Sequence, residues 1–264
     1  MPIRHPEGRS RPEVPGTAAF GKFMNVLQAV ADAPGKVTIG QLSRDLGMPR
    51  PTIHRIVAAL LAEGMLAEEF SGRIGLGPRL VSLAFRAWDG SALRQVAQES
   101  LSRLRDRLDE TVHLAVHEGE GMVYIDKLES RRNVRMASRI GTRVPLHSTS
   151  VGKAWLASLT EPELQQVLAG IDLTPRTPHS IKDLESLRAE IAKTRERGYS
   201  LDLQENELDI CCYGKACKGP EGKVLGCISV SLPRYRFQEL PEQEVLAAMQ
   251  ECVDSMEAQL GSSA

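Results

Sequence analysis

The stretch MPRPTIHRIVAALLAEGML, residues 48–66, has the pattern of an amphipathic helix that opens near a proline and closes at a glycine. Its apolar residues recur at the spacing of a single helix face. The first turn instead gathers polar side chains: Arg50, Thr52, His54 and Arg55. A helix that only packs needs no hydrogen-bond donors collected at one end. We therefore interpret this turn as a contact surface for another molecule.

A second, shorter helix precedes this one over residues 38–46. Thr38 and Gln41 form a capping-box pattern at its start, and Gly47 ends it. A short glycine-containing turn between two helices is typical of the helix-turn-helix, whose second helix enters the DNA major groove. The alternative is a three-helix packing module with incidental polar residues.

The flanking segments extend this motif into a winged domain over residues 17–77. An apolar helix pattern covers 20–33, and residues 66–70 and 73–76 read as a hairpin around Ser71-Gly72. We expect double-stranded DNA as the partner. The candidate DNA contacts lie on the two paired helices and on the wing: Ser43, Arg50, Thr52, His54, Arg55 and Arg73.

Composition places the 264-residue chain among globular proteins, with 42% hydrophobic and 25% charged residues. No apolar run reaches the ~18–20 residues that cross a bilayer, so no membrane partner is expected.

Residues 1–16 have no signal-peptide core and predict a disordered basic arm. Residues 1–55 hold eight Lys/Arg and four Asp/Glu, which favours a polyanion at the front of the chain. Five cysteines, an odd number, indicate a reducing cytoplasm.

Residues 78–90 predict a linker helix that is apolar on two sides. Leu80, Leu83 and Trp88 belong to one stripe, while Val81 and Phe85 lie off it. Because a short helix cannot cover two apolar sides alone, a partner subunit is the expected second cover. A homodimer or a dimer of dimers would then bind a pseudo-palindromic operator.

Residues 91–260 mix helices and strands, which indicates an α+β or α/β domain. A long helix is expected to residue 110, alternating strands surround Gly119-Glu120-Gly121, and helices cover 161–170 and 184–198. A last strand covers 223–233, where alternation puts Ser229 and Ser231 on one face and their apolar neighbours on the other.

Five segments together resemble the IclR family of bacterial transcription regulators over residues 17–260. They are TIGQLSRDLGMPRPTIHRIVAALLAEGML, GRIGLGPRLVSLA, RIGTRVPLHSTSVGKAWLA, RERGYSLDLQENE and GCISVSLP. The resemblance implies a two-domain α+β protein: an N-terminal winged helix-turn-helix, a helical linker and a C-terminal GAF-like α/β effector-binding domain. Such proteins control catabolic operons in response to small metabolites. Within the family the chain is most similar to regulators of sugar-acid catabolism that answer to 2-keto-3-deoxygluconate.

The same resemblance implies an effector site for a small carboxylate. We expect no cofactor and no metal. The backbone at Ser150 and Val151 matches the turn that receives the carboxylate, and Met136 matches an apolar wall. Four further residues match the polar positions of the site: Asp202, Cys212, Ser229 and Ser231.

One region departs from the family pattern at Asp209, Cys211-Cys212 and Lys215. Asp209 would add negative charge beside the pocket and Lys215 could offset it. A Lys215 that points inward would favour a more acidic or larger ligand.

The other function class is a redox- or metal-responsive regulator that uses Cys211, Cys212, Cys217 and Cys227. Their spacing matches no common zinc motif, and on a strand Cys212 and Cys217 would face opposite sides. Buried, inert thiols are therefore the favoured interpretation. We find no glycine-rich phosphate loop and no nucleophile with an obvious base, so the chain is not expected to be an enzyme.

Overall fold

The computed structural model describes residues 15–33, 37–69, 72–132 and 136–262, so all but the end of the expected N-terminal arm lies outside the described residues. The chain divides into two compact units, Met1–Gly90 and Ser91–Ala264. Among the described residues, no helix is long and apolar enough to cross a membrane.

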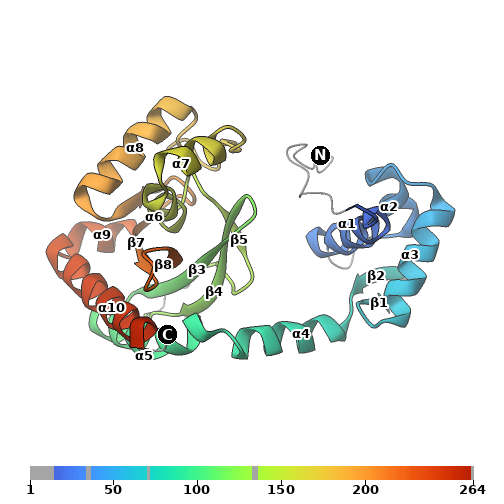
Figure 1. The fold of residues 1–264 in the computed structure, drawn as a ribbon, viewed down its shortest axis with the longest axis horizontal. Helices are drawn as coiled ribbons and strands as arrows, with labels where there is room; N and C mark the ends of the chain where they lie inside the picture. Colours follow the sequence, from blue (N-terminus) through green and yellow to red (C-terminus); the bar gives the residue numbers. More distant parts are fainter. Residues whose placement is uncertain (1–14, 34–36, 70–71, 133–135, 263–264) are drawn as a thin grey trace. The chain divides into compact units, whose positions relative to one another are not determined.

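The first unit is a three-helix domain with a two-stranded antiparallel hairpin (Figure 1). The predicted capping box at the start of the second helix is present, with Thr38 and Gln41 bonded reciprocally. Buried residues from the helices and the hairpin, among them Val26, Leu42 and Ile53, form one core. The elements are α1 (Ala18–Asp32), α2 (Ile39–Asp45), α3 (Arg50–Ala62), β1 (Leu66–Glu69) and β2 (Arg73–Leu76).

The linker helix α4 (Pro78–Asp89) follows the hairpin and, within the described chain, buries none of its own residues. Leu80 packs against the core of the first unit. Val81, Leu83 and Phe85 are 57%, 46% and 57% exposed, although large apolar side chains favour burial. The predicted helix is therefore present with exposed apolar side chains, and the partner subunit as its second cover stays a prediction.

The second unit is built on a six-stranded antiparallel sheet in the order β5-β4-β3-β8-β7-β6. The strands are β3 (Thr111–Glu118), β4 (Gly121–Leu128), β5 (Arg143–Pro145), β6 (Ser200–Leu203), β7 (Ile210–Lys218) and β8 (Val224–Pro233). The helices are α5 (Ala92–Leu108), α6 (Ser150–Ser158), α7 (Glu161–Leu168), α8 (Leu184–Arg197), α9 (Arg234–Glu239) and α10 (Glu242–Ser262).

The two faces of this sheet carry different helices and separate cores (Figure 1). Helices α5 and α10 cover one face, where Val112, Ile228 and Leu232 are buried. Helices α6, α7 and α8 lie on the other face, where Ala115 and Cys227 are buried. The alternation predicted for the last strand is therefore confirmed, because Ser229 and Ser231 point to the α6 side.

Candidate functional site

The second helix of the helix-turn-helix, α3, presents a polar first turn to solvent. Ile53, Ile56 and Val57 are buried in the domain core, as predicted. Arg50, His54 and Arg55 are exposed, and Thr52 is partly exposed. Exposed donors at the N-terminal end of such a helix can reach base edges and phosphates. The geometry therefore leaves this turn available to DNA.

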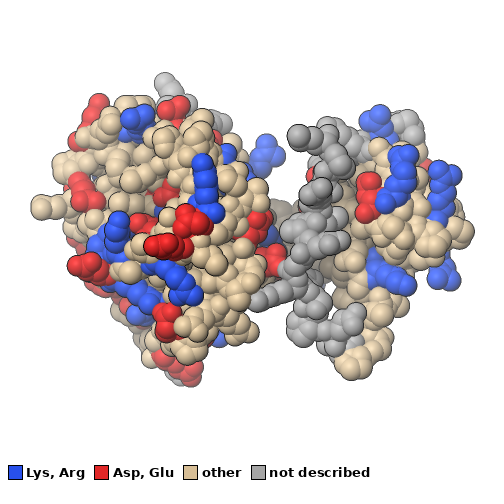
Figure 2. Space-filling view, turned by 90° about the horizontal axis from the view of Figure 1, so that it is seen from above, with Lys and Arg blue, Asp and Glu red and all other residues tan. Residues whose placement is uncertain are grey.

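The remaining candidate DNA contacts, Ser43 and Arg73, occupy different surroundings. The Ser43 hydroxyl donates to the Met48 carbonyl oxygen at 2.6 Å, which fastens the turn between α2 and α3. Arg73 is exposed at the start of the second hairpin strand. On the face seen in Figure 2, the first unit shows mostly blue charges, while the second shows both colours intermixed. The individual DNA contacts stay predictions.

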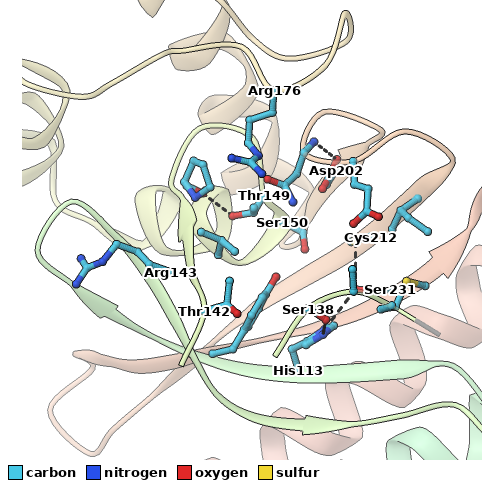
Figure 3. Close-up of a pocket in the computed structure, with 18 residues that line it drawn as sticks. His113, Ser138, Thr142, Arg143, Thr149, Ser150, Arg176, Asp202, Cys212 and Ser231 are labelled. Carbon is cyan, nitrogen blue, oxygen red and sulfur yellow. Dashed lines mark hydrogen bonds between the residues drawn. The ribbon is translucent and has the colours of Figure 1, made fainter. Parts of the chain in front are cut away.

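A cavity of about 210 Å³ lies in the second unit, between the sheet and the start of α6 (Figure 3). Residues from β3, β4, β5 and β7 and from the loops around Arg176 and Asn206 line it. Five of the seven predicted effector contacts are among them: Met136, Ser150, Asp202, Cys212 and Ser231. The fold thus collects in one place residues that are up to 95 positions apart in the chain, from Met136 to Ser231.

The other two predicted contacts, Val151 and Ser229, are not lining residues of this cavity. The Val151 side chain is fully buried in the core under α6, so only its backbone amide could contribute. The Ser229 hydroxyl lies 3.3 Å from the Nδ1 atom of His113. Ser229 therefore contacts His113, which lines the cavity, but does not line the cavity itself. A direct contact between Ser229 and a ligand stays a prediction.

The first turn of α6 offers backbone donors to the cavity. Thr149 caps the helix, and its hydroxyl accepts from the Gly152 amide at 3.1 Å. Among the described residues, no acceptor is found for the amides of Ser150 or Val151. Free amides at a helix start suit an anion.

Two glycines let this turn approach its neighbours. A Cβ atom on Gly214 of β7 would lie 2.6 Å from the Ser150 carbonyl oxygen, and one on Gly152 would lie 2.4 Å from that of Leu146. Neither position has room for a side chain. The helix start can therefore sit directly on the sheet beside the cavity.

His113, which was not among the predicted effector contacts, also lines the cavity. Its Nε2 atom lies 2.7 Å from the Ser138 hydroxyl, and its Nδ1 atom lies 3.4 Å from the Ser231 hydroxyl (Figure 3). Burial and the nearby Lys127 lower the pKa of His113 to about 3. The ring is therefore neutral at physiological pH, with one nitrogen donating and the other accepting. Lys127 also donates to the Met136 and Ser138 carbonyl oxygens at 2.9 and 2.7 Å, which holds this segment over the cavity.

Asp202 is the buried acid of the cavity wall. Its Oδ1 atom accepts from the amides of Glu205 and Asn206 at 2.7 and 3.3 Å. Burial raises the pKa of Asp202 to about 7, against the lowering effect of Lys153. Behind it, the fully buried Lys153 of α6 forms an ion pair with Glu205. Asp202 thus lines the cavity, while Lys153 and Glu205 do not line it and form a buried ion pair next to Asp202.

Two of the residues that depart from the family pattern, Lys215 and Asp209, do not line this cavity. The Lys215 ammonium donates to the Gly198 carbonyl oxygen at 3.2 Å and lines a separate hollow beside α10. The possibility that Lys215 points inward and selects a more acidic ligand is therefore wrong, because strand alternation turns it away from Cys212. Asp209 is exposed and is not a lining residue of the cavity.

The cysteines give little support to a redox or metal site. All five are free and buried, and burial raises the pKa of Cys212 and Cys217, which disfavours the reactive thiolate. Cys212 lines the cavity, whereas Cys217 lies in the core under α10, so the two face opposite sides as predicted. Within the described residues, no group of three His, Cys, Asp or Glu side chains could hold a metal ion.

Several lining residues gave no signal in the sequence, among them Tyr124, Thr142 and Arg176. Tyr124 is expected to face one side of a strand, but its pattern does not tell which. Arg176 belongs to a loop, where no periodicity exists. His113 could have been found only by pairing its strand with the distant strand of Ser229 and Ser231.

Comparison with known proteins assigns the family. Residues 85–258 match the model described as bacterial transcriptional regulator IclR C-terminal, and residues 21–69 match the IclR helix-turn-helix domain. The chain belongs to the IclR family of transcriptional regulators. This confirms the two-domain fold and the resemblance seen in the sequence, and a regulator of this family is not an enzyme.

Individual members of the IclR family align with nearly the whole chain. The HTH-type transcriptional regulator KdgR of Escherichia coli is 32% identical over 241 residues, which cover 91% of each protein. The regulator XynR of the same organism is 31% identical over 83% of this chain and 87% of its own length. A solved IclR homologue from Microbacterium hydrocarbonoxydans, complexed with 4-hydroxybenzoate, superposes with a TM-score of 0.76 at 26% identity and covers 92% of this chain and 99% of that one.

Proposed function

We propose that this IclR-family protein controls a catabolic operon in the cytoplasm. Its effector is a small organic acid, and within that class a sugar acid. The observation that carries the proposal is the 210 Å³ cavity. There the start of α6 offers backbone amides that have no acceptor among the described residues, beside several hydroxyl groups. Amides at a helix start favour an anion, and the hydroxyls of Ser138, Thr142 and Ser231 favour a ligand that is itself hydroxylated.

Two likenesses support an organic acid. The Microbacterium homologue was solved with 4-hydroxybenzoate, which is a carboxylate. The effector segment of this chain resembles regulators of sugar-acid catabolism. The cavity is small compared with the pockets of roughly 300–1,000 Å³ that hold drug-sized molecules, so a compact metabolite fits better than a large one.

The DNA half of the proposal predicts a loss of operator affinity in Arg55→Ala. If this exposed side chain meets a base edge, binding should weaken by about 1–3 kcal/mol. Gel-shift titrations on a fragment from the neighbouring operon measure the effect. Addition of 2-keto-3-deoxygluconate should change the affinity of the wild-type protein, since a ligand switches DNA binding only when it binds the two states unequally.

The matched control for this experiment is Arg188→Ala, which removes an exposed arginine of α8 in the other unit. It should bind the operator like the wild type. Equal affinities of the Arg55→Ala variant and the wild type would remove Arg55 from the contacts. If the wild type binds its operator but sugar acids do not change that affinity, only the effector part of the proposal fails.

The linker helix supports a proposed homodimer or dimer of dimers. Leu83 and Phe85 are exposed in the single chain, and Phe85 meets Trp88 edge to face, with ring centroids 6.0 Å apart. Burial of such a surface against a second copy would stabilise the assembly by roughly 25 cal/mol per Å² of apolar area. Two recognition helices would then meet the two halves of a pseudo-palindromic operator.

Phe85→Glu should therefore shift the protein toward monomers, because it places a charge in the proposed interface. Light scattering at micromolar concentration measures the assembly state. Gln165→Glu, on an exposed position of α7, adds the same charge elsewhere and should leave the mass unchanged. A wild-type protein that is monomeric and still binds its operator tightly would rule out the dimer.

A further inference from the structure

We infer that Arg176 binds the carboxylate of the effector, together with the amides at the start of α6. This inference rests on the proposed function, since it names the residue that recognises the acid group of the ligand. Arg176 lies in the loop between α7 and α8, and it lines the cavity. In Figure 3 its side chain points toward Thr149 and Ser150.

The backbone beside Arg176 is held firmly in place. Its amide donates to the Ser180 hydroxyl at 3.0 Å, and that hydroxyl donates to the Glu205 carbonyl oxygen at 2.6 Å. The Thr177 hydroxyl donates to the Gln204 carbonyl oxygen at 2.7 Å. These bonds join the loop to the segment that follows Asp202. The guanidinium is thus presented to the cavity from a fixed base, which lowers the entropy lost when a ligand binds.

The guanidinium of Arg176 has no carboxylate partner among the described residues, although most arginines of this unit do. Arg143, the other arginine of the cavity wall, is bonded to both the carbonyl oxygen and the carboxylate of Glu118. In Figure 3 the Arg143 side chain extends away from the labelled cluster. Its charge is therefore already matched, whereas that of Arg176 remains for an incoming anion. A planar guanidinium suits a carboxylate because it can donate two parallel hydrogen bonds.

The rest of the cavity indicates how much negative charge the ligand carries. Asp202 and Glu207 also line the wall, and Asp202 is ionised above its pKa of about 7, so a second anionic group on the ligand would meet like charges there. One arginine and one helix start, set against two acids, favour a single carboxylate with a hydroxylated, uncharged tail. The ligand class is therefore a hydroxylated monocarboxylic acid.

Calorimetry on the full-length protein tests the assignment with two acids, gluconate and 2-keto-3-deoxygluconate, and with gluconamide as the uncharged counterpart of gluconate. The wild type should bind at least one acid, and gluconate more tightly than gluconamide. Arg176→Gln should weaken acid binding by about 10- to 100-fold, which is the range for loss of a charge-assisted hydrogen bond. Its affinity for gluconamide should stay the same.

The matched control is Arg188→Gln, which removes an exposed arginine of α8 that does not line the cavity, and it should retain acid binding. Thermal unfolding without ligand should be the same for wild type and Arg176→Gln, because Arg176 is exposed. Equal acid affinities of wild type and Arg176→Gln would overturn the role of Arg176 and leave the proposed function standing. If neither acid binds while the protein still binds its operator, the sugar-acid part of the proposed function fails, and the Arg176 assignment fails with it.

Discussion

Lys153→Met should destabilise the protein by about 3–5 kcal/mol, because it removes one partner of a buried ion pair. Lys153 is fully buried and lies on α6, and its ammonium contacts Glu205. The ammonium donates to the Glu205 Oε1 atom, and the Oε2 atom has no hydrogen-bond partner among the described residues. Once the ammonium is gone, the Glu205 carboxylate is left in a low-dielectric environment with nothing to compensate its charge.

The effect of this substitution should depend on pH. Burial already raises the pKa of Glu205, and Lys153 opposes that rise. Without Lys153 the pKa of Glu205 rises further, so the folded variant takes up a proton at mildly acidic pH. A carboxyl group whose pKa is raised on folding loses stabilisation as the pH increases. The loss caused by Lys153→Met should therefore be larger at pH 8 than at pH 5.

Urea unfolding at both pH values measures the free energies. Lys193→Met, on an exposed position of α8, is the control and should change the stability by less than about 0.5 kcal/mol. The double variant Lys153→Met with Glu205→Met should regain most of the loss, since a buried pair replaced by apolar side chains is often neutral. A loss below about 1 kcal/mol in the single variant would contradict the buried ion pair.

Asp202→Asn should make the protein more stable relative to wild type as the pH rises. The pKa of Asp202 is about 7 in the folded protein, against an ordinary value of 3.8. Between these values the folded state binds more protons than the unfolded state, so wild-type stability falls with increasing pH. An asparagine carries no such charge. The difference in unfolding free energy between the two proteins should shift by roughly 2–3 kcal/mol in favour of the variant from pH 5 to pH 8.

Asparagine keeps the side-chain oxygen that accepts from the Glu205 and Asn206 amides. Asp202→Ala removes that acceptor and should be less stable than Asp202→Asn at every pH, by about 1–3 kcal/mol. Denaturant titrations from pH 5 to pH 8 give both comparisons, and the titrating histidines cancel because every protein contains them. A difference between wild type and Asp202→Asn that is independent of pH would show that Asp202 does not take up a proton on folding.

Much of the fold could be predicted because helix and strand periodicities are local. The faces of α3 follow from Ile53, Ile56 and Val57, and the capping pair Thr38 and Gln41 marks the start of the helix before it. The alternation of β8 correctly separates the two serines from the core. The sequence predicts a strand at Cys212 and Cys217 but not its bounds, because ICCYGKACK has no apolar–polar alternation: residues on both faces of β7 are buried.

The candidate site divides in the same way. Met136, Ser150, Asp202, Cys212 and Ser231 came from the likeness to a family, and the fold brings all five to one cavity. His113 joins them because β3 pairs with β8 more than a hundred residues later. Lys215 turns away from them because strand register decides its side.

The sequence by itself thus determined the DNA-binding helix pair, the apolar linker helix and the faces of the strands with clear alternation. In each of these, neighbours within a few positions settle which side of the element is apolar. Only the tertiary structure decided that Lys153 is buried against Glu205 and that Arg176 reaches the cavity from a loop. Charged residues on a short helix or in a loop have the same local pattern whether they meet water or a distant acid. Their surroundings depend on long-range packing, which the local pattern of apolar and polar residues does not predict.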